Sequence, residues 1–177
     1  PVRSAGILAS LAIVVAACGA GGTEDGGPAP SADEWRTAVL TDARTGETFS
    51  VNDLGGKVVV IEPMAIWCVN CQFQQGEVAV ALDRLDDPSL VYISLDVDPN
   101  EQPDALARYA DERGWSWRYV VASRDVARSL AAEFGDQVLS PPSTPMILIG
   151  PDGAVVEQHL GIRGSDELID AFERYLP

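Results

Sequence analysis

The sequence predicts an α/β fold in which a central mixed β-sheet is covered by helices on both faces. Short β-branched runs alternate along the chain with longer stretches of helical periodicity, which is the pattern of a sheet flanked by helices. The last two strands form a hairpin, so the sheet should not be wholly parallel. With 177 residues, 46% of them hydrophobic, the chain can bury one substantial core but not two large ones.

The folded part is expected to begin near Asp33. Two short strands, at residues 35–40 and 48–51, flank a turn-rich segment and predict an N-terminal β-hairpin extension. Gly55 and Gly56 then break the chain before the β-branched run at 57–61, which has the composition of a buried central strand.

A long helix is predicted to begin at the segment Trp67-Cys68-Val69-Asn70-Cys71 and to reach about residue 85. Its apolar residues at positions 69, 73, 80 and 82 are expected to line one broad buried face. Residues 90–95 form a second run of buried-strand character.

The C-terminal half repeats the alternation of helix and strand. Pro103 suits the first turn of a helix, and Ser123 is a plausible N-cap for the next one. Ser165 can cap the last helix. The expected strands are 117–121, 146–149 and 154–158, and the last two flank a strong turn signal at 150–153.

The chain is strongly acidic, with a formal net charge of −15 and a sequence pI near 4.2. Such a surface disfavours nucleic acid as a partner and gives no electrostatic attraction to anionic lipid. We interpret the acidity as a solvated surface, although an acidic docking face for a basic partner fits as well.

The N-terminal residues predict export and lipidation. An uncharged apolar run at 5–17 follows Arg3, and Val15-Ala16-Ala17-Cys18 resembles the lipobox of bacterial lipoproteins. A plain secretory signal or an uncleaved anchor helix are the alternatives. We expect residues 1–18 to be a lipoprotein signal ending at the lipidated Cys18, residues 19–32 to be a flexible Gly- and Pro-rich linker, and residues 33–177 to be the folded domain. The protein would then be anchored to the outer face of the cell membrane.

Cys68 and Cys71 form a CxxC pair, which allows three interpretations. A structural disulfide would close too short a loop to stabilise the fold much. Half of a zinc site would need further ligands, and the one histidine, His159, is distant in sequence. A redox dithiol fits the context best, because the pair lies where a buried strand passes into a helix. The helix N-terminus favours a thiolate at an exposed Cys68, and Cys71 is placed to attack the resulting mixed disulfide.

The stretch from Val58 to Cys71 resembles the active-site segment of the thioredoxin superfamily, and it is most similar to the extracytoplasmic, membrane-anchored (TlpA/ResA-like) thiol–disulfide oxidoreductases. Ser143-Thr144-Pro145-Met146 and the strand that follows resemble the second signature of that family. The resemblance spans roughly residues 33–177. It implies a thioredoxin-like fold, no cofactor, and protein disulfides or dithiols as substrates.

The resemblance also implies roles for individual residues. Cys68 would be the nucleophile and Cys71 the resolving cysteine. Pro145 would be cis and lie opposite the cysteines, so that Thr144 can pair with the substrate backbone, while Trp67 packs beside the sulfurs. Glu62, six residues before Cys68, would accept the proton of Cys71 if its carboxyl is buried; a half-exposed acid at the end of a strand is the alternative.

We expect the protein to be a monomer. We also expect it to act as a reductase, because no cationic residue lies near the pair in sequence to stabilise a thiolate strongly. An upstream membrane or extracytoplasmic donor would supply the electrons. A copper-binding protein of the same fold is the alternative, since Leu95-Asp96-Val97-Asp98-Pro99 resembles Sco-type copper chaperones. Those proteins space their cysteines differently and have a histidine where this chain has Ser143 and Thr144, so no metal site is expected.

Overall fold

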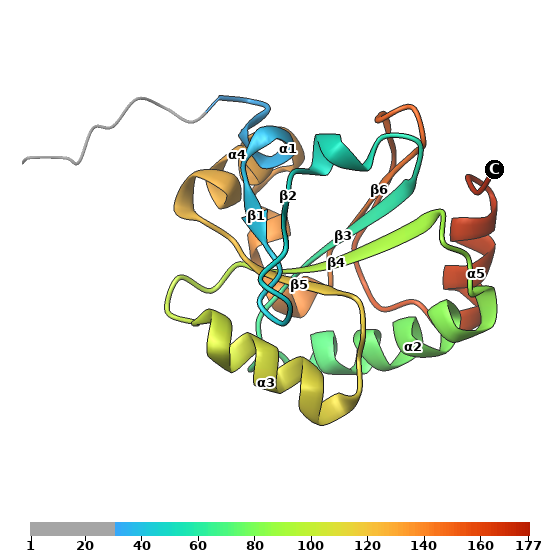
Figure 1. Ribbon diagram of the computed structural model, residues 1–177, viewed down its shortest axis with the longest axis horizontal. Coiled ribbons are helices and arrows are strands. Elements are labelled where there is room, and N and C mark those ends of the chain that lie inside the picture. Colours follow the sequence, from blue (N-terminus) through green and yellow to red (C-terminus); the bar gives the residue numbers. More distant parts are fainter. Residues whose placement is uncertain (1–30) are drawn as a thin grey trace, which may run out of the picture.

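The computed structural model describes residues 31–177, and the predictions for residues 1–30, including the signal peptide and lipidation at Cys18, lie outside them (Figure 1). A five-stranded sheet with the strand order β5-β4-β3-β6-β7 forms its centre. Strands β3, β4 and β5 are parallel, whereas β6 and β7 run antiparallel to their neighbours. The predicted mixed sheet is therefore confirmed.

The elements follow each other with short connections. The strands of the central sheet are β3 (Val58–Met64), β4 (Leu90–Asp96), β5 (Arg118–Val121), β6 (Met146–Ile149) and β7 (Val155–His159). The helices are α1 (Glu34–Thr37), α2 (Val69–Leu85), α3 (Pro103–Arg113), α4 (Arg124–Phe134) and α5 (Ser165–Glu173). A separate two-stranded sheet pairs β1 (Leu40–Thr41) with β2 (Thr48–Phe49), and three short 3₁₀ helices cover Val51–Leu54, Asp136–Leu139 and Pro141–Ser143.

The N-terminal hairpin is present, but its first strand is much shorter than predicted. Trp35 lies in helix α1 and is only 1% exposed. Its backbone N–H donates to Ser129 Oγ at 3.2 Å, and its indole N–H donates to a Glu133 carboxylate oxygen at 2.7 Å. These contacts with α4, far away in sequence, favour a helical turn over the strand that the local pattern suggested.

Contacts with the domain already begin at Ser31. The Ser129 hydroxyl lies 3.1 Å from the carbonyl oxygen of Ser31 and 3.0 Å from that of Ala32, the last two residues of the predicted linker. The chain therefore meets the domain at α4.

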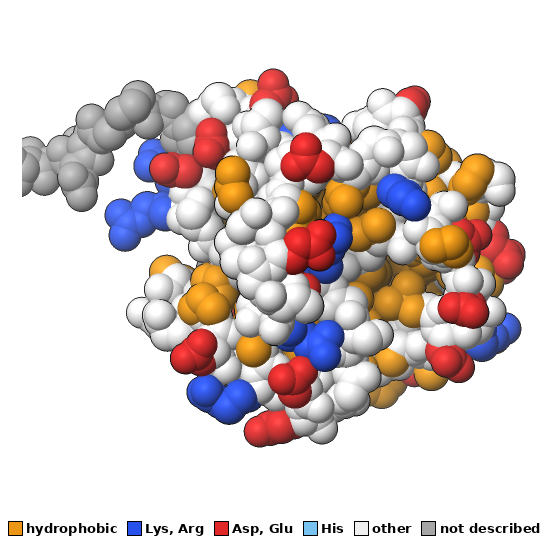
Figure 2. Space-filling model, viewed as in Figure 1, with side chains coloured by type: hydrophobic (Ala, Val, Ile, Leu, Met, Phe, Trp, Pro, Cys, Tyr) orange, Lys and Arg blue, Asp and Glu red, His pale blue; other side chains and the backbone are white. Residues whose placement is uncertain are grey.

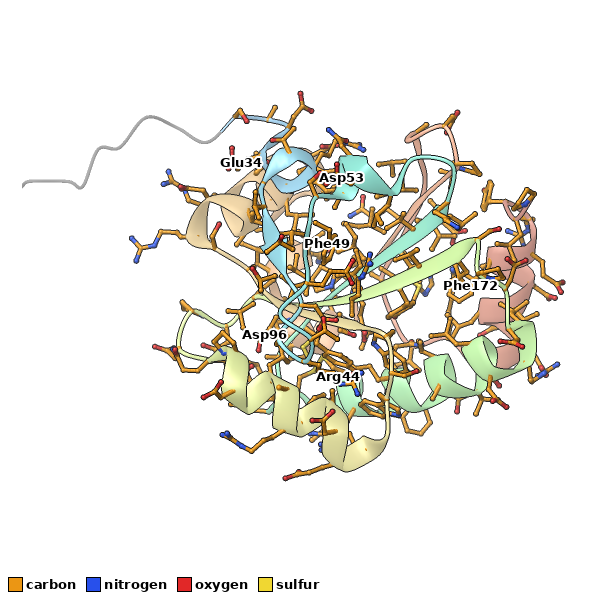
Figure 3. All side chains as sticks on the ribbon, viewed as in Figure 1. Glu34, Arg44, Phe49, Asp53, Asp96 and Phe172 are labelled. Atoms are coloured by element: carbon orange, nitrogen blue, oxygen red, sulfur yellow. A yellow bond between two sulfur atoms is a disulfide. The ribbon has the colours of Figure 1, made fainter. Side chains whose placement is uncertain are left out.

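The sheet separates two cores, because successive side chains of a strand point to opposite faces. On β3, Val59 and Ile61 pack with α1, α4 and the hairpin, whereas Val60 packs with α2 and α5. Glu62 and Met64 share the face of Val60. Helix α3 covers the same face beside α2 (Figure 1). The labelled side chains Phe49 and Phe172 mark the two cores in Figure 3.

Helix α2 has the predicted length, but it buries a different face. Val69 and Phe73 are 75% and 60% exposed, and Val80 is exposed as well, whereas the fourth predicted residue, Leu82, is partly buried against the core. The buried residues are Cys71, Gln74, Gln75, Val78 and Ala81, which recur at helical spacing on the opposite side. The apolar periodicity predicted the wrong face because two glutamines find partners inside the protein: Gln75 donates to Glu62 of β3, and Gln74 pairs with the backbone of Arg163, just before α5.

The other helix starts are close to the predictions. Pro103 occupies the first turn of α3, and Ser123 caps α4 by accepting the N–H of Val126 at 3.2 Å. Helix α5 is capped one residue earlier than expected, since Glu167 accepts the N–H of Gly164 at 3.1 Å. None of the helices in residues 31–177 combines the length and apolar character needed to cross a lipid bilayer.

Replacing Trp35 with alanine should destabilise the domain by about 3–5 kcal/mol, because a large buried ring and the hydrogen bond from its indole N–H to Glu133 are lost together. Trp67→Ala is the matched control. Its side chain is 55% exposed, and its loss should cost less than about 1 kcal/mol. Urea unfolding curves of the two variants test this, and equal losses would contradict the anchoring role of Trp35.

Candidate active site

Cys68 and Cys71 form a disulfide at the junction between β3 and α2. Cys68 is the N-cap residue of α2, and its sulfur accepts the backbone N–H of Cys71 at 3.1 Å. The sulfur of Cys71 instead lies 3.2 Å from the carbonyl oxygen of Pro141. In the reduced protein, this contact allows a protonated Cys71 thiol to donate to that oxygen.

The two sulfurs therefore have opposite electrostatic surroundings. A backbone N–H at the positive end of a helix stabilises a thiolate at Cys68. A carbonyl oxygen close to Cys71 repels a thiolate and favours the protonated thiol. The geometry distinguishes a sulfur suited to be the nucleophile from one suited to keep its proton until a later step.

The sulfurs are less accessible than the sequence suggested. Cys68 is only 2% exposed, so the expectation of an exposed first cysteine is wrong for the disulfide form. The exposed groups around it are apolar side chains. Trp67 precedes Cys68, while Val69 and Phe73 lie on the outer face of the first turns of α2. These three exposed apolar side chains, Trp67, Val69 and Phe73, are close to the cysteines along the chain, and we call them the apolar rim.

Pro145 was expected to be cis, and this is wrong: the Thr144–Pro145 peptide bond is trans. The chain reverses by other means. The 3₁₀ turn Pro141–Ser143 leads into Thr144, which adopts the left-handed conformation with φ 42° and ψ 59°. The Thr144 N–H donates to the Pro141 carbonyl at 2.9 Å, so this N–H is already used within the turn.

This turn nevertheless lies beside the cysteines, as the sequence predicted. Besides the contact of Cys71 with Pro141, the Asn70 side chain donates to the Pro142 carbonyl at 2.9 Å. Thr144 itself is buried. These contacts therefore hold the turn against the first residues of α2.

Glu62 is fully buried, which settles the choice between a buried and a half-exposed acid. One carboxylate oxygen accepts hydrogen bonds from Gln75 Nε2 at 3.1 Å and from Ser94 Oγ at 3.0 Å, and the other has no hydrogen-bond partner. Burial raises the pKa of Glu62 to about 8, against the opposing effect of these hydrogen bonds. Gln75 lies one helical turn after Cys71, so Glu62 reaches the cysteine helix through this amide.

The hydrogen bonds of Glu62 belong to a larger buried network. The Gln75 side-chain oxygen accepts from the hydroxyls of Tyr109 at 3.0 Å and Tyr119 at 3.3 Å, and Trp117 Nε1 donates to Ser94 Oγ at 2.9 Å. Sequence reasoning missed this network. The signal was available in Gln75, because a position four residues after Cys71 lies on the same helix face.

A second acidic group contacts the loop 65–67 in front of Cys68. The Ile66 N–H donates to both carboxylate oxygens of Glu101, at 3.2 and 3.0 Å, and the Trp67 indole N–H donates to Asp98 at 2.7 Å. Asp96, at the end of β4, is fully buried, and the pKa of its carboxyl is raised to about 9 by burial and by contact with Glu101. Sequence reasoning noted this segment only for its resemblance to copper chaperones.

His159 lies nearer to this end of the sheet than its distance in sequence suggested. It ends β7 opposite Met146, and Gly161 donates its N–H to the Ser143 carbonyl at 2.8 Å. Partial burial lowers the pKa of His159, so the neutral imidazole is favoured. Within residues 31–177, no group of three or more His, Cys, Asp or Glu side chains is arranged to hold a metal ion.

The hollow visible on the surface in Figure 2 lies away from the disulfide. Leu82, Leu90, Tyr92 and Trp117 contribute to its lining, so it lies between the far end of α2 and the start of β4. Another hollow adjoins the site itself: Trp67 and Ile66 line a shallow groove together with Tyr109, Arg108 and Arg113 of α3.

Comparisons with known proteins extend the description of the fold. No family model matches the chain, and no curated protein matches its sequence. Solved structures do match. A thiol:disulfide interchange protein of the thioredoxin family from Chlorobium tepidum TLS superimposes with a TM-score of 0.68 at 17% identity, over 87% of this chain and 100% of that one.

Two further structures bear on the alternatives considered above. A secreted Mycobacterium tuberculosis disulfide oxidoreductase, described as homologous to E. coli DsbE, has a TM-score of 0.63 at 15% identity, over 80% of this chain and 98% of its own. BsSco, of the Sco family of cytochrome c oxidase assembly proteins, has a TM-score of 0.61 at 18% identity, over 76% of this chain and 88% of its own. At these identities the comparisons establish the fold: residues 31–177 form a thioredoxin-like domain with an N-terminal hairpin and a CxxC disulfide.

Proposed function

We propose that this protein is an extracytoplasmic, lipid-anchored thiol–disulfide oxidoreductase that reduces protein disulfides through Cys68 and Cys71. The observation that carries the proposal is the asymmetry of the two sulfurs. The Cys68 sulfur accepts a backbone N–H at the start of α2, whereas the Cys71 sulfur faces the Pro141 carbonyl oxygen. A structural disulfide requires no such difference, but a nucleophile followed by a resolving thiol does.

The reaction begins from the dithiol. The Cys68 thiolate attacks one sulfur of the client disulfide, forms a mixed disulfide, and releases the first client thiolate. Cys71 then loses its proton and attacks the Cys68 sulfur, which releases the second client thiolate and leaves the Cys68–Cys71 disulfide. Two electrons have passed to the client, and an upstream dithiol donor restores the reduced pair.

Glu62 is the proposed acceptor for the Cys71 proton. Its carboxyl has a pKa of about 8, so the protonated and ionised forms are both accessible near neutral pH. The hydrogen bond from Gln75 fixes the carboxyl against the helix that carries Cys71. Proton loss from Cys71 would occur only after the mixed disulfide has formed.

The acids near Cys68 support the direction of electron flow. Asp98 and Glu101 contact the two residues immediately before it. Negative charge close to a thiolate destabilises it and so favours the disulfide form, which makes the dithiol a better reductant. The apolar rim suits an unfolded or extended client segment with apolar side chains beside its disulfide.

The location is proposed from the N-terminal sequence. The apolar run and the Cys18 lipobox motif support export and lipidation. The likeness to a secreted disulfide oxidoreductase is consistent with action outside the cytoplasm. Mass spectrometry of the membrane fraction tests the anchor, because a diacylated or triacylated Cys18 is expected as the N-terminal residue.

Cys71→Ser should trap a mixed disulfide, since the resolving thiol is absent after Cys68 has attacked a client. The expected result is a covalent adduct with insulin or a disulfide-bonded peptide that dithiothreitol releases. Cys68→Ser is the matched control and should trap none. Wild-type protein should reduce insulin. An adduct with neither variant, together with no insulin reduction by wild type, would reject the redox function.

Glu62→Gln should flatten the pH dependence of stability and slow resolution of the mixed disulfide. The pKa of Glu62 is raised in the folded state, so the folded protein keeps a proton that the unfolded chain releases. Its contribution to the free energy of unfolding is fully present below about pH 4.5 and is lost as pH rises towards about 8. The slope is at most about 1.4 kcal/mol per pH unit.

Urea unfolding at pH 5, 6.5 and 8 measures this slope, and quenched-flow analysis of the mixed disulfide measures the resolution rate. Glu112→Gln, on the exposed face of α3, is the control and should change neither quantity. A Glu62→Gln variant with the wild-type slope would show that Glu62 is ionised in the folded protein.

A Sco-like copper function is the second candidate, because BsSco shares the fold and His159 lies at the same end of the sheet as the turn beside the cysteines. Two thiolates can bind Cu(I), but tight binding usually needs a further ligand. We expect the reduced protein to bind Cu(I) no more tightly than a simple dithiol, and His159→Ala to leave the affinity unchanged. Competition with a Cu(I) chelator measures this affinity. Tight binding that depends on His159 would favour the copper function instead.

A further inference from the structure

The loop 65–67 connects β3 to Cys68, and the segment between β4 and α3 holds it in place. Glu101 accepts the Ile66 N–H with both carboxylate oxygens, and Asp98 accepts the Trp67 indole N–H. Two acids from one segment thus bind two consecutive residues in front of the nucleophile. The position of the Cys68 sulfur depends on this loop, because the loop leads directly into the N-cap of α2.

Asp96 lies behind Glu101 at the end of β4, where Figure 3 labels it between the sheet and α3. It is fully buried. Its Oδ1 accepts the Asp98 N–H at 2.9 Å, but its Oδ2 has no hydrogen-bond donor. A buried carboxylate oxygen without a donor is costly. A proton on Asp96 removes this cost, because the protonated oxygen can donate to the Glu101 carboxylate that it contacts.

We propose that Asp96 and Glu101 are positioning residues for Cys68: protonated Asp96 holds Glu101 against the Ile66 N–H and so fixes the loop in front of the nucleophile. When Asp96 loses its proton, two like charges meet, the hydrogen bond between them is lost, and a negative charge is added near the Cys68 sulfur. The pair is thus a second proton site at the active centre, distinct from Glu62. The inference rests on the proposed function only in taking Cys68 as the nucleophile.

The surroundings of Asp96 explain why the proton is held there. Its neighbours across the sheet are Met64 on β3 and Val121 on β5, neither of which titrates. The raised pKa of Asp96, about 9, follows from burial first and from Glu101 second, against a lowering by the Asp98 N–H. The titratable or charged groups on the packed elements include Asp98 in the same segment, Tyr109 and Arg113 on α3, Tyr119 on β5 and Glu62 on β3.

Two alkylating reagents of different charge can detect this proton. In the full chain with Cys18→Ser and Cys71→Ser, Cys68 is the sole thiol. Iodoacetamide is neutral and iodoacetate is an anion, and both react with the thiolate. The rate with iodoacetamide divided by the rate with iodoacetate therefore does not depend on the ionisation of Cys68 itself. Between pH 8 and 10 this ratio should rise roughly two- to threefold, because a new negative charge repels iodoacetate.

Asp96→Asn in that background should remove most of this rise, since asparagine donates to Glu101 and never ionises. Glu101→Gln should reduce the rise and move it to lower pH, because it removes the carboxylate that favours the Asp96 proton and leaves burial as the remaining cause; this variant decides the matter if Asp96→Asn does not fold. Asp98→Asn is the matched control: it removes a charge that contacts the same loop but leaves the buried proton, so the rise should persist.

Circular dichroism at each pH confirms that the variants are folded. A full rise in both Asp96→Asn and Glu101→Gln, or no rise in the parent, would overturn the inference. Alkylation needs neither a client nor an electron donor. Failure of this test is therefore separate from failure of the insulin and trapping tests, which address the proposed reductase activity.

Discussion

The hydrogen bond between Gln75 and Glu62 is the interaction on which the site depends. It joins the helix that carries Cys71 to the central strand β3, in a place where neither polar group meets water. A buried amide and a buried carboxyl are tolerated only when they satisfy one another. Once Gln75 faces the sheet, helical geometry directs Val69 and Phe73 outward, so a polar contact inside the protein produces the apolar rim outside it.

The same region concentrates acids that carry fewer charges than the sequence implies. Burial favours the neutral form of Glu62 and of Asp96, whereas Asp98, on the surface, has a lowered pKa because it accepts hydrogen bonds from Asn100 and Trp67. Counting every acidic side chain as ionised, as the formal net charge of −15 does, therefore overstates the negative charge at the active centre. A thiolate at Cys68 is held between a helix N-terminus that stabilises it and acids that oppose it, and the protonation of those acids sets the balance.

The sequence predicted the mixed sheet, the CxxC junction, the nearby proline turn and a buried position for Glu62 as one of two alternatives. These features depend on local signals: β-branched runs, caps and turn residues. The features that the sequence could not predict depend on contacts between residues far apart along the chain. Trp35 adopts a helical turn because of α4, and the buried face of α2 follows from the partners of Gln75 on β3, α3 and β5. Thr144 adopts a left-handed conformation before its trans bond to Pro145, and no local pattern indicates that conformation for a β-branched residue.

Helix α1 and the residues Ser31 and Ala32 before it have a mechanical consequence. The chain enters the domain along α4, on the face of the sheet opposite α2, and it is held there by Trp35 and by the Ser129 hydroxyl. Tension on the N-terminal end of the domain would be transmitted to α4 and the hairpin core. The cysteine helix lies on the other side of five hydrogen-bonded strands and would feel little of it. A domain tethered through Ser31 would thus take the load on the face of the sheet opposite the helix that carries Cys71.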